Sequence, residues 1–398
     1  MSQANQAQHA NSPQALRRTA AYYLLFVGLG LSSAVLGPTL PMLAEQTHSR
    51  VGAMGLLFSA TSLGYTVGTL LGGRLYDRLR GHPILGAAQV TAGLLLLLVP
   101  AAPALWMLAC ILAVKGFTDG LVNTGVHTLL MWTHGERVGP FMNGLHFSFG
   151  LGAFLSPLLV AQAVSFHVDY GWAFRALAVF NLLGGLVTLL LRGQPTAPQQ
   201  PARVSPETSR SDALWIAVAA LFLFFYVGAE IAFGGWLYTY TTSLELAGPA
   251  AAAYLTSAFW LAFTVGRLLA IAAATRFAPR RVVLVALLGC LGFLGLLFAV
   301  PWSPSALWVA AIGLGFCMAP IYPTAFTMVG QMIRLNARTT SLVLLGDSLG
   351  ALLLPWLVGQ VLDATGPQAL VYLVTASLVC NLVAFGGLQW KSRAEQAR

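Results

Sequence analysis

Long apolar stretches, separated by short polar connections, dominate the chain. A helix needs about 20 residues to cross the roughly 30 Å hydrocarbon core of a bilayer. Because the apolar stretches are continuous rather than alternating, they favour helices over a membrane-spanning barrel of strands. The pattern predicts an all-α membrane protein with twelve transmembrane helices, at residues 20–44, 52–76, 83–102, 104–133, 139–165, 172–192, 213–243, 250–275, 281–300, 303–332, 338–362 and 367–390.

Two stretches of the first half recur in the second half at one common offset of 198 residues. Residues 57–71 match 255–269 at nine positions, and residues 151–162 match 349–360 at eight. This repeat predicts two pseudo-symmetric six-helix bundles joined head to tail. Such symmetry is typical of transporters that bind their substrate near mid-membrane, where the repeats meet.

The longest polar connection is rich in Pro, Ser and Gln, a composition typical of a flexible linker. It divides the chain into parts with distinct expected roles. These are an N-terminal cytoplasmic tail (1–19), an N-terminal six-helix bundle (20–192), a cytoplasmic linker (193–212), a C-terminal six-helix bundle (213–390) and a C-terminal tail (391–398).

Composition and charge agree with this organisation. Hydrophobic residues make up 57% of the chain and charged residues 8%, against roughly 25% charged in soluble domains. The bases lie before the first span and after even-numbered spans, whereas the opposite side has only Arg50 and Arg175. Positive residues stay on the cytoplasmic side, so both termini are predicted to be cytoplasmic.

The net charge of +9 follows mostly from this asymmetry. Because the bases are dispersed over separate short loops, a nucleic-acid partner is not expected. The short loops and compact termini indicate a multi-pass protein of the plasma membrane, in a bacterial inner membrane. We expect it to function as a monomer in the lipid bilayer.

Ionisable side chains within the predicted spans are the first candidates for function, because an unpaired charge at that depth costs about 3 kcal/mol or more. Lys115, Asp119, Glu230, Arg267 and Asp347 are such residues. An enzyme is not indicated, since no nucleophile–base pair, metal cluster or phosphate-binding loop is evident in the sequence.

Asp119, Asn123 and His127 follow one another at intervals of four, which places them on one helix face. One interpretation is a polar track that binds sugar hydroxyls, with Asp119 binding a coupling cation and, if that cation is sodium, with Asn123 as a second ligand. The alternative is that Lys115 and Asp119 neutralise each other so that the helix inserts.

In the second half, Glu230 precedes Trp236 in one span, an arrangement that suits a pyranose with its polar hydroxyls and apolar C–H face. The alternative is a structural pair between Glu230 and Arg267. Asp347 occupies a position where the first half has Phe149; it either binds substrate or coupling ion, or pairs with Arg267.

Three further residues complete the predicted substrate site: His146, Trp260 and Tyr322. Each has a structural alternative. A lone histidine is often a satisfied core donor, and a single aromatic residue more commonly fills a core than stacks on a ligand.

The loop at residues 72–82, GGRLYDRLRGH, resembles the loop signature of the major facilitator superfamily. Gly73, Asp77 and Arg78 fit that signature, and the second half has Thr275 in place of Asp77. The resemblance implies an inner gate in which a carboxylate at a helix end pairs with bases in one conformation only. The gating candidates are Gly73, Arg74, Asp77, Arg78 and Arg267.

Within that superfamily, residues 116–127, 139–160, 227–240 and 251–271 look like the sodium-dependent glucose transporter branch, which is similar to fucose-permease-type sugar symporters. The resemblance implies import of a hexose such as glucose by cation-coupled symport with alternating access, without a cofactor. The coupling ion is Na⁺ or H⁺, and Asp119, Glu230 and Asp347 are the coupling candidates. The alternative is a proton-coupled exporter of drugs or amphiphiles from the same superfamily.

Overall fold

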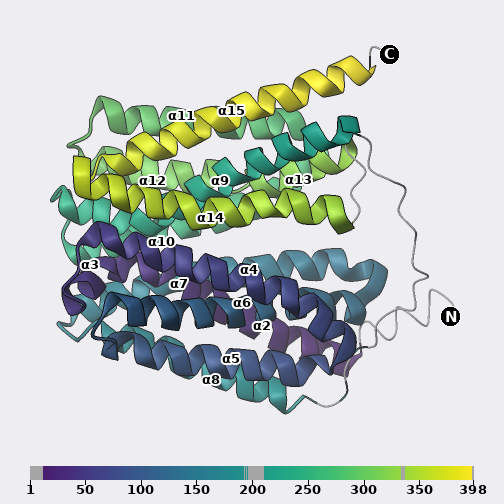
Figure 1. The fold of residues 1–398 in the computed structure, drawn as a ribbon, viewed down its shortest axis with the longest axis horizontal. Coiled ribbons are helices and arrows are strands. Elements are labelled where there is room, and N and C mark those ends of the chain that lie inside the picture. The colour runs from purple at the N-terminus through teal and green to yellow at the C-terminus, as the bar shows by residue number, and fades with distance from the viewer. Residues whose placement is uncertain (1–11, 192, 194, 196–209, 333–336, 397–398) are drawn as a thin grey trace. The chain divides into compact units, whose positions relative to one another are not determined.

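In the computed structural model the protein is helical throughout the part that the structure describes, residues 12–191, 193, 195, 210–332 and 337–396, and no strand occurs there (Figure 1). Every apolar range predicted from the sequence contains helical residues. The first helix begins at Pro13, earlier than the predicted span. Ser12 caps it by accepting the Ala15 N–H at 3.2 Å, and a proline at the first helical position needs no N–H partner.

The chain forms two compact units. Unit 1 consists of Met1–Ser49 and Ala60–Pro201, and unit 2 consists of Arg50–Ser59 and Ala202–Arg398. The helices of unit 1 are α2 (Pro13–Ala34), α3 (Leu36–Gln46), most of α4 (Gly55–Arg78), α5 (Gly81–Leu98), α6 (Leu105–His134), α7 (Val138–Ser165) and α8 (Gly171–Leu189), with short 3₁₀ turns η2 (Val99–Ala101) and η3 (Gly135–Arg137).

Unit 2 has a similar helix content. It contains η1 (Val51–Met54), the first turn of α4, α9 (Arg210–Ser243), α10 (Pro249–Arg276), α11 (Pro279–Ala299), α12 (Pro304–Met318), α13 (Ile321–Met332), α14 (Ala337–Thr365) and α15 (Ala369–Gln396).

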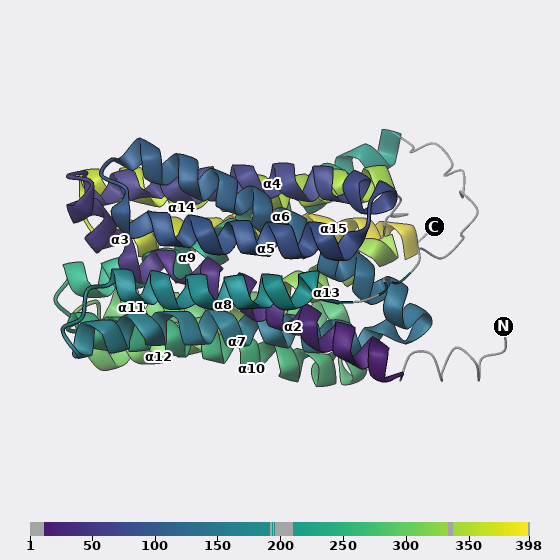
Figure 2. The ribbon, with the colours of Figure 1, turned by 90° about the horizontal axis from the view of Figure 1, so that it is seen from below.

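Within unit 1, α2 packs on α7 and α8, and α5 lies beside α8 in both views (Figures 1 and 2). Within unit 2, α9 packs on α14 and α15, and α12 packs on α10 and α11.

Among the described residues, ten helical segments are long and apolar enough to cross a membrane, and the bent pair α2–α3 would make eleven. One of the ten, Leu105–Ser165, joins α6 and α7 through η3. The protein is therefore an integral, multi-pass membrane protein with about ten to twelve apolar helices.

Proline accounts for two breaks in these helices. The axes of α2 and α3 differ by 49°, and Pro38 lacks the N–H that would bond to the Ala34 carbonyl across the break. Pro320 lies between α12 and α13, at a break inside the predicted span 303–332. Backbone groups freed at such breaks are available for hydrogen bonds with side chains.

The same backbone contacts recur in the two units. A Cβ at Gly152 of α7 would overlap the Val27 carbonyl oxygen of α2, and a Cβ at Gly350 of α14 would overlap that of Phe224 in α9. Only glycine allows helices to approach so closely. The repeat found in the sequence therefore reflects a shared packing of helix pairs.

A second glycine pair defines which positions of α6 and α12 are equivalent. A Cβ at Gly116 would overlap the carbonyl oxygen of Thr61, and a Cβ at Gly315 would overlap that of Phe259. Phe259 lies 198 residues after Thr61 and so occupies the same position in the repeat. Aligning these glycines places Met318 at the position that Asp119 occupies in unit 1.

The segment Arg50–Ser59, although early in the chain, belongs to unit 2. The Gly52 N–H donates to Oδ1 of Asp363 at 2.9 Å, and the Ser59 hydroxyl donates to the Leu352 carbonyl at 2.7 Å. These bonds attach η1 and the first turn of α4 to α14.

Candidate functional site

Two oppositely charged side chains of α6 pair inside unit 1. The Lys115 ammonium is bonded to Oδ2 of Asp119, one helical turn along, and the two side chains are 3% and 7% exposed. The Thr118 hydroxyl donates to the Lys115 carbonyl at 2.7 Å. The structure thus forms the self-neutralising pair that was one of the two interpretations of this sequence pattern.

A second polar group lies farther along α6. The His127 ring donates from Nδ1 to the Asn123 carbonyl at 2.8 Å. Its ring centre is 5.5 Å from that of His146 in α7, and both rings pack in a T-shaped arrangement with that of Phe26 in α2. The packing of three helices therefore brings together two predicted substrate residues, His127 and His146, that lie on different helices.

In unit 2, Glu230 of α9 lies in a group of polar side chains from several helices. It hydrogen-bonds to Tyr226, one turn earlier, and Arg267 of α10 and Asp347 of α14 are its charged neighbours. The Tyr226 hydroxyl, which is fully buried, donates to the Met318 carbonyl of α12 at 2.6 Å. That carbonyl lies at the break before Pro320.

Arg267 packs on an aromatic ring. Its guanidinium carbon is 4.4 Å from the centre of the Phe263 ring, an arrangement typical of a cation–π contact. Over the described ranges, no carboxylate lies within 4.0 Å of its nitrogens, and its buried Nε has no hydrogen-bond partner there. Glu230 and Arg267 are therefore neighbours, but they do not form the direct ion pair that was the structural alternative.

Asp347 is held by a hydroxyl instead of a base. Tyr322 of α13 donates to its Oδ2 at 3.0 Å, and the Tyr322 ring stacks along that of Phe326. In the part of the chain that the structure covers, no basic group lies within 4.0 Å of this carboxylate. Unit 2 thus joins two predicted site residues, Asp347 and Tyr322, in one hydrogen bond.

The two predicted tryptophans have different surroundings. Trp260 is half-buried, packs edge-on against Phe263 at 5.6 Å, and lies over Gly234, where a Cβ would be 2.8 Å from the indole. Trp236 is fully buried, and its N–H donates to the Pro355 carbonyl at 2.9 Å. Trp260 therefore contacts the same Phe263 ring as Arg267, whereas the hydrogen bond of Trp236 favours a packing role.

The gating candidates of α4 lie at an exposed helix end. Arg74, Asp77 and Arg78 are exposed, and Gly73 has no atom within reach of an added Cβ. Asp77 forms no ion pair with any base that the structure describes. Between them, Tyr76 is buried and anchors the helix end by donating to the Leu121 carbonyl at 3.0 Å.

A sodium ion on Asp119 and Asn123 would compete with a cation already present. The Lys115 ammonium occupies one oxygen of the Asp119 carboxylate, so these two residues fit sodium only if Lys115 moves away. Among the described residues, no group of three or more His, Cys, Asp or Glu side chains is arranged to hold a metal.

Sequence reasoning missed several residues that the structure places at these groups. Tyr226 and Phe26 both contact predicted site residues, and the one-turn spacing of Tyr226 before Glu230 was a signal that could have found it. A buried pair, Gln89 of α5 and Asn181 of α8, also went unnoticed because each is isolated in an apolar run.

The comparisons with known proteins decide the family. A family model described as the Major Facilitator Superfamily matches residues 22–336 and 247–398. The chain belongs to this superfamily. It is 31% identical to the sodium-dependent glucose transporter 1A of Mus musculus over 388 residues, covering 89% of this chain and 91% of that protein. It is 29% identical to the sodium-dependent glucose transporter 1 of Homo sapiens, covering 88% and 74%.

Solved structures support the same fold. A crystal structure of a mutant of the nucleoside transporter NupG matches with a TM-score of 0.76 at 14% identity, over 94% of this chain and 99% of that one. The relatives and the fold are those of transporters of the major facilitator superfamily and not of enzymes. A small-molecule substrate and a membrane-embedded site follow from this membership.

Proposed function

We propose that this protein imports a hexose, such as glucose, by symport with a cation, working as a monomer through alternating access. Twelve spans with both termini in the cytoplasm of a bacterial cell complete the proposal. Its main support is the similarity, over 89% of the chain, to a protein named as a sodium-dependent glucose transporter.

The single structural observation that carries the proposal is the group around Glu230 in unit 2. Sugar hydroxyls need planar acceptors and donors, and the C–H face of a pyranose stacks on aromatic rings. Glu230, Asp347 and Tyr322 supply the polar atoms, and Trp260 supplies a ring that packs on Phe263, as Arg267 does. In unit 1, Asn123, His127 and His146 offer a second set of polar contacts.

We assign cation coupling to carboxyl groups that lack an ion-pair partner. Glu230 and Asp347 have no base within contact distance among the described residues, so a bound cation would offset the cost of their burial. The conformational change would then be favourable only for the loaded protein, because a ligand shifts an equilibrium by its differential affinity for the two states. Asp119 could take part only by exchanging Lys115 for the coupling cation.

The two candidate coupling ions make different demands on the surroundings of Glu230. A proton needs only this one carboxyl group, whereas a sodium ion would require further oxygen ligands in addition to the carboxylate.

The test is uptake of labelled glucose and other hexoses into proteoliposomes, with sodium and proton gradients imposed separately. We expect accumulation that depends on one of the two gradients and is inhibited by unlabelled hexose. Hexose uptake that is unaffected by either gradient would contradict symport. Transport of lipophilic cations in exchange for protons, without hexose uptake, would support the exporter alternative.

A further inference from the structure

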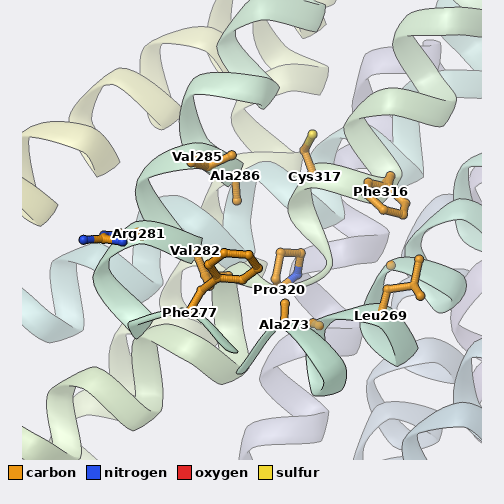
Figure 3. Close-up of a pocket in the computed structure, with 12 residues that line it drawn as sticks. Leu269, Ala273, Phe277, Arg281, Val282, Val285, Ala286, Phe316, Cys317 and Pro320 are labelled. Carbon is orange, nitrogen blue, oxygen red and sulfur yellow. The ribbon is translucent and has the colours of Figure 1, made fainter. Parts of the chain in front are cut away.

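Unit 2 contains a cavity of about 460 Å³ that is separate from the Glu230 group. It lies where the end of α10, the start of α11 and the break between α12 and α13 meet (Figure 3). Phe277 and Pro320 face each other at its centre, Leu269 and Phe316 lie to one side, and Arg281 extends from the opposite margin away from the apolar side chains.

The lining is apolar and open to the surroundings of the helices. Phe277, in the short connection between α10 and α11, is 55% exposed, and Val285 of α11 is 68% exposed. A sugar would find no set of hydroxyl partners here, because Arg281 is the one charged group among the lining residues. The volume lies within the roughly 300–1,000 Å³ of small-molecule sites, and the lining suits a hydrocarbon chain.

The charge at the margin of this cavity has no counter-ion in the nearby sequence. Arg276, Arg280 and Arg281 lie within six residues, and residues 246–346 contain neither Asp nor Glu. The corresponding loop of the first half has Asp77 where this loop has Thr275. The start of α11 adds positive charge, since Ala278 provides no side-chain cap for its free N–H groups.

We propose that this cavity binds an anionic phospholipid, with one acyl chain between Leu269, Phe277 and Phe316 and the phosphate against Arg281. Basic pockets between transmembrane helices on the cytoplasmic side recognise anionic headgroups, and the loop between α10 and α11 is predicted to be cytoplasmic from its arginines. The acyl chain distinguishes this site from a general attraction of the basic loop to the membrane surface, because only the cavity supplies apolar walls. The inference does not depend on which solute is transported.

The experiment titrates the purified, full-length protein in detergent with phosphatidylglycerol or phosphatidylcholine and measures bound lipid by native mass spectrometry. Two pairs of variants separate headgroup from chain. Arg281→Gln removes the base that lines the cavity, and Arg276→Gln removes an exposed base of the same loop that does not line it. Ala273→Trp fills the cavity, and Ala274→Trp places the same ring on the exposed neighbouring position.

We expect tighter binding of phosphatidylglycerol than of phosphatidylcholine, and a loss of about fivefold in Arg281→Gln, the size typical of one base near a membrane surface. Arg276→Gln and Ala274→Trp should bind as the unchanged protein does, whereas Ala273→Trp should lose the tightest site for both lipids. The thermal stabilisation by phosphatidylglycerol should follow the same order in the four variants.

Four results would overturn the proposal. Equal binding of the two lipids would remove the role of the phosphate charge. Equal losses in Arg281→Gln and Arg276→Gln would indicate general attraction to the loop. Unchanged binding in Ala273→Trp, or full competition by glycerol phosphate without acyl chains, would show that the cavity holds no chain.

Discussion

In unit 1 two buried charges, Lys115 and Asp119, lie on one helix and neutralise each other. In unit 2 three half-buried charges, Glu230, Arg267 and Asp347, come from three helices, and none has an ion-pair partner among the described residues. The helix packing beneath them is shared, as the contacts of Gly152 and Gly350 show. The charges themselves are not equivalent. Asp119 corresponds to Met318, and Thr69 and Phe149 occupy the positions of Arg267 and Asp347.

The two units therefore share the packing of their helices but not the charged residues that those helices carry. A buried charge with its partner one turn away is stable in every conformation of its helix, because the pair moves as one body. Charges on α9, α10 and α14 depend on how three helices pack, so a change in that packing alters their interactions. Unit 2 is therefore where a bound cation is expected to have the larger effect on conformation.

The largest effect is expected from breaking the Lys115–Asp119 pair. Lys115→Met leaves the Asp119 carboxylate buried without a counter-ion, which should destabilise the protein by about 3–5 kcal/mol, whereas the double variant with Asp119→Leu should recover most of that loss. Thermal unfolding in detergent measures both changes.

Uptake by the double variant then decides the role of Asp119. A stable double variant that still accumulates substrate would show that the pair is structural. A stable double variant that has lost gradient-driven accumulation, but still exchanges substrate, would show that Asp119 takes part in coupling.

The second effect is expected at Glu230. Glu230→Gln keeps the shape of the side chain and removes its charge, so closure no longer requires a cation. Accumulation against a gradient should fall by a hundredfold or more, on the order of the 3 kcal/mol that an unpaired charge costs at this depth, while substrate exchange without a gradient continues. Glu245→Gln is the matched control, because Glu245 is exposed in the turn that follows the same helix. Accumulation at the normal level in Glu230→Gln would remove Glu230 from the coupling mechanism.

A smaller effect is expected from the hydrogen bond between Tyr322 and Asp347. Tyr322→Phe deletes the hydroxyl, and a hydrogen bond to a charged group contributes about 1.5–3 kcal/mol. We expect a tenfold or larger rise in KM for the substrate and a shifted pH profile of uptake. Tyr372→Phe, on an exposed ring of α15, serves as the control. Equal behaviour of the two variants would indicate that Tyr322 only fills space.

The smallest effect is expected at the histidine pair of unit 1. His127→Gln keeps a donor near the Asn123 carbonyl and removes the ring that faces His146, a change of about 1 kcal/mol for one neutral hydrogen-bonding group. KM should rise about fivefold with little change in maximal rate. If His146→Gln raises KM equally and the double variant adds nothing further, the two rings act as one group; additive effects would show two independent contacts.

Much of the fold could be predicted because it depends on local properties. The length of each apolar run determines whether a helix can cross a bilayer. The repeat can be recognised because identical residues recur at one spacing. Within one helix, residues four apart share a face, so the Lys115–Asp119 pair and the neighbouring positions of Asn123 and His127 were also predictable.

The candidate site was predicted only in part, because its contacts join different helices. Nothing local places His146 against His127, or Tyr322 against Asp347, since each contact depends on how two helices are rotated about their axes. For the same reason Trp236 and Trp260 looked alike in sequence, although Trp236 donates to a backbone carbonyl in the core and Trp260 packs against Phe263.

By itself, the sequence determined that this protein is a helical, internally repeated membrane protein, because hydrophobic length and residue spacing act along one segment at a time. Only the tertiary structure decided that His127 meets His146, that Asp347 meets Tyr322, and that Arg267 lies over Phe263 and not against an acid of the described residues. The physical reason is that a buried polar atom takes whichever partner the packing of neighbouring helices brings within about 3 Å, and those helices can be far apart in the chain.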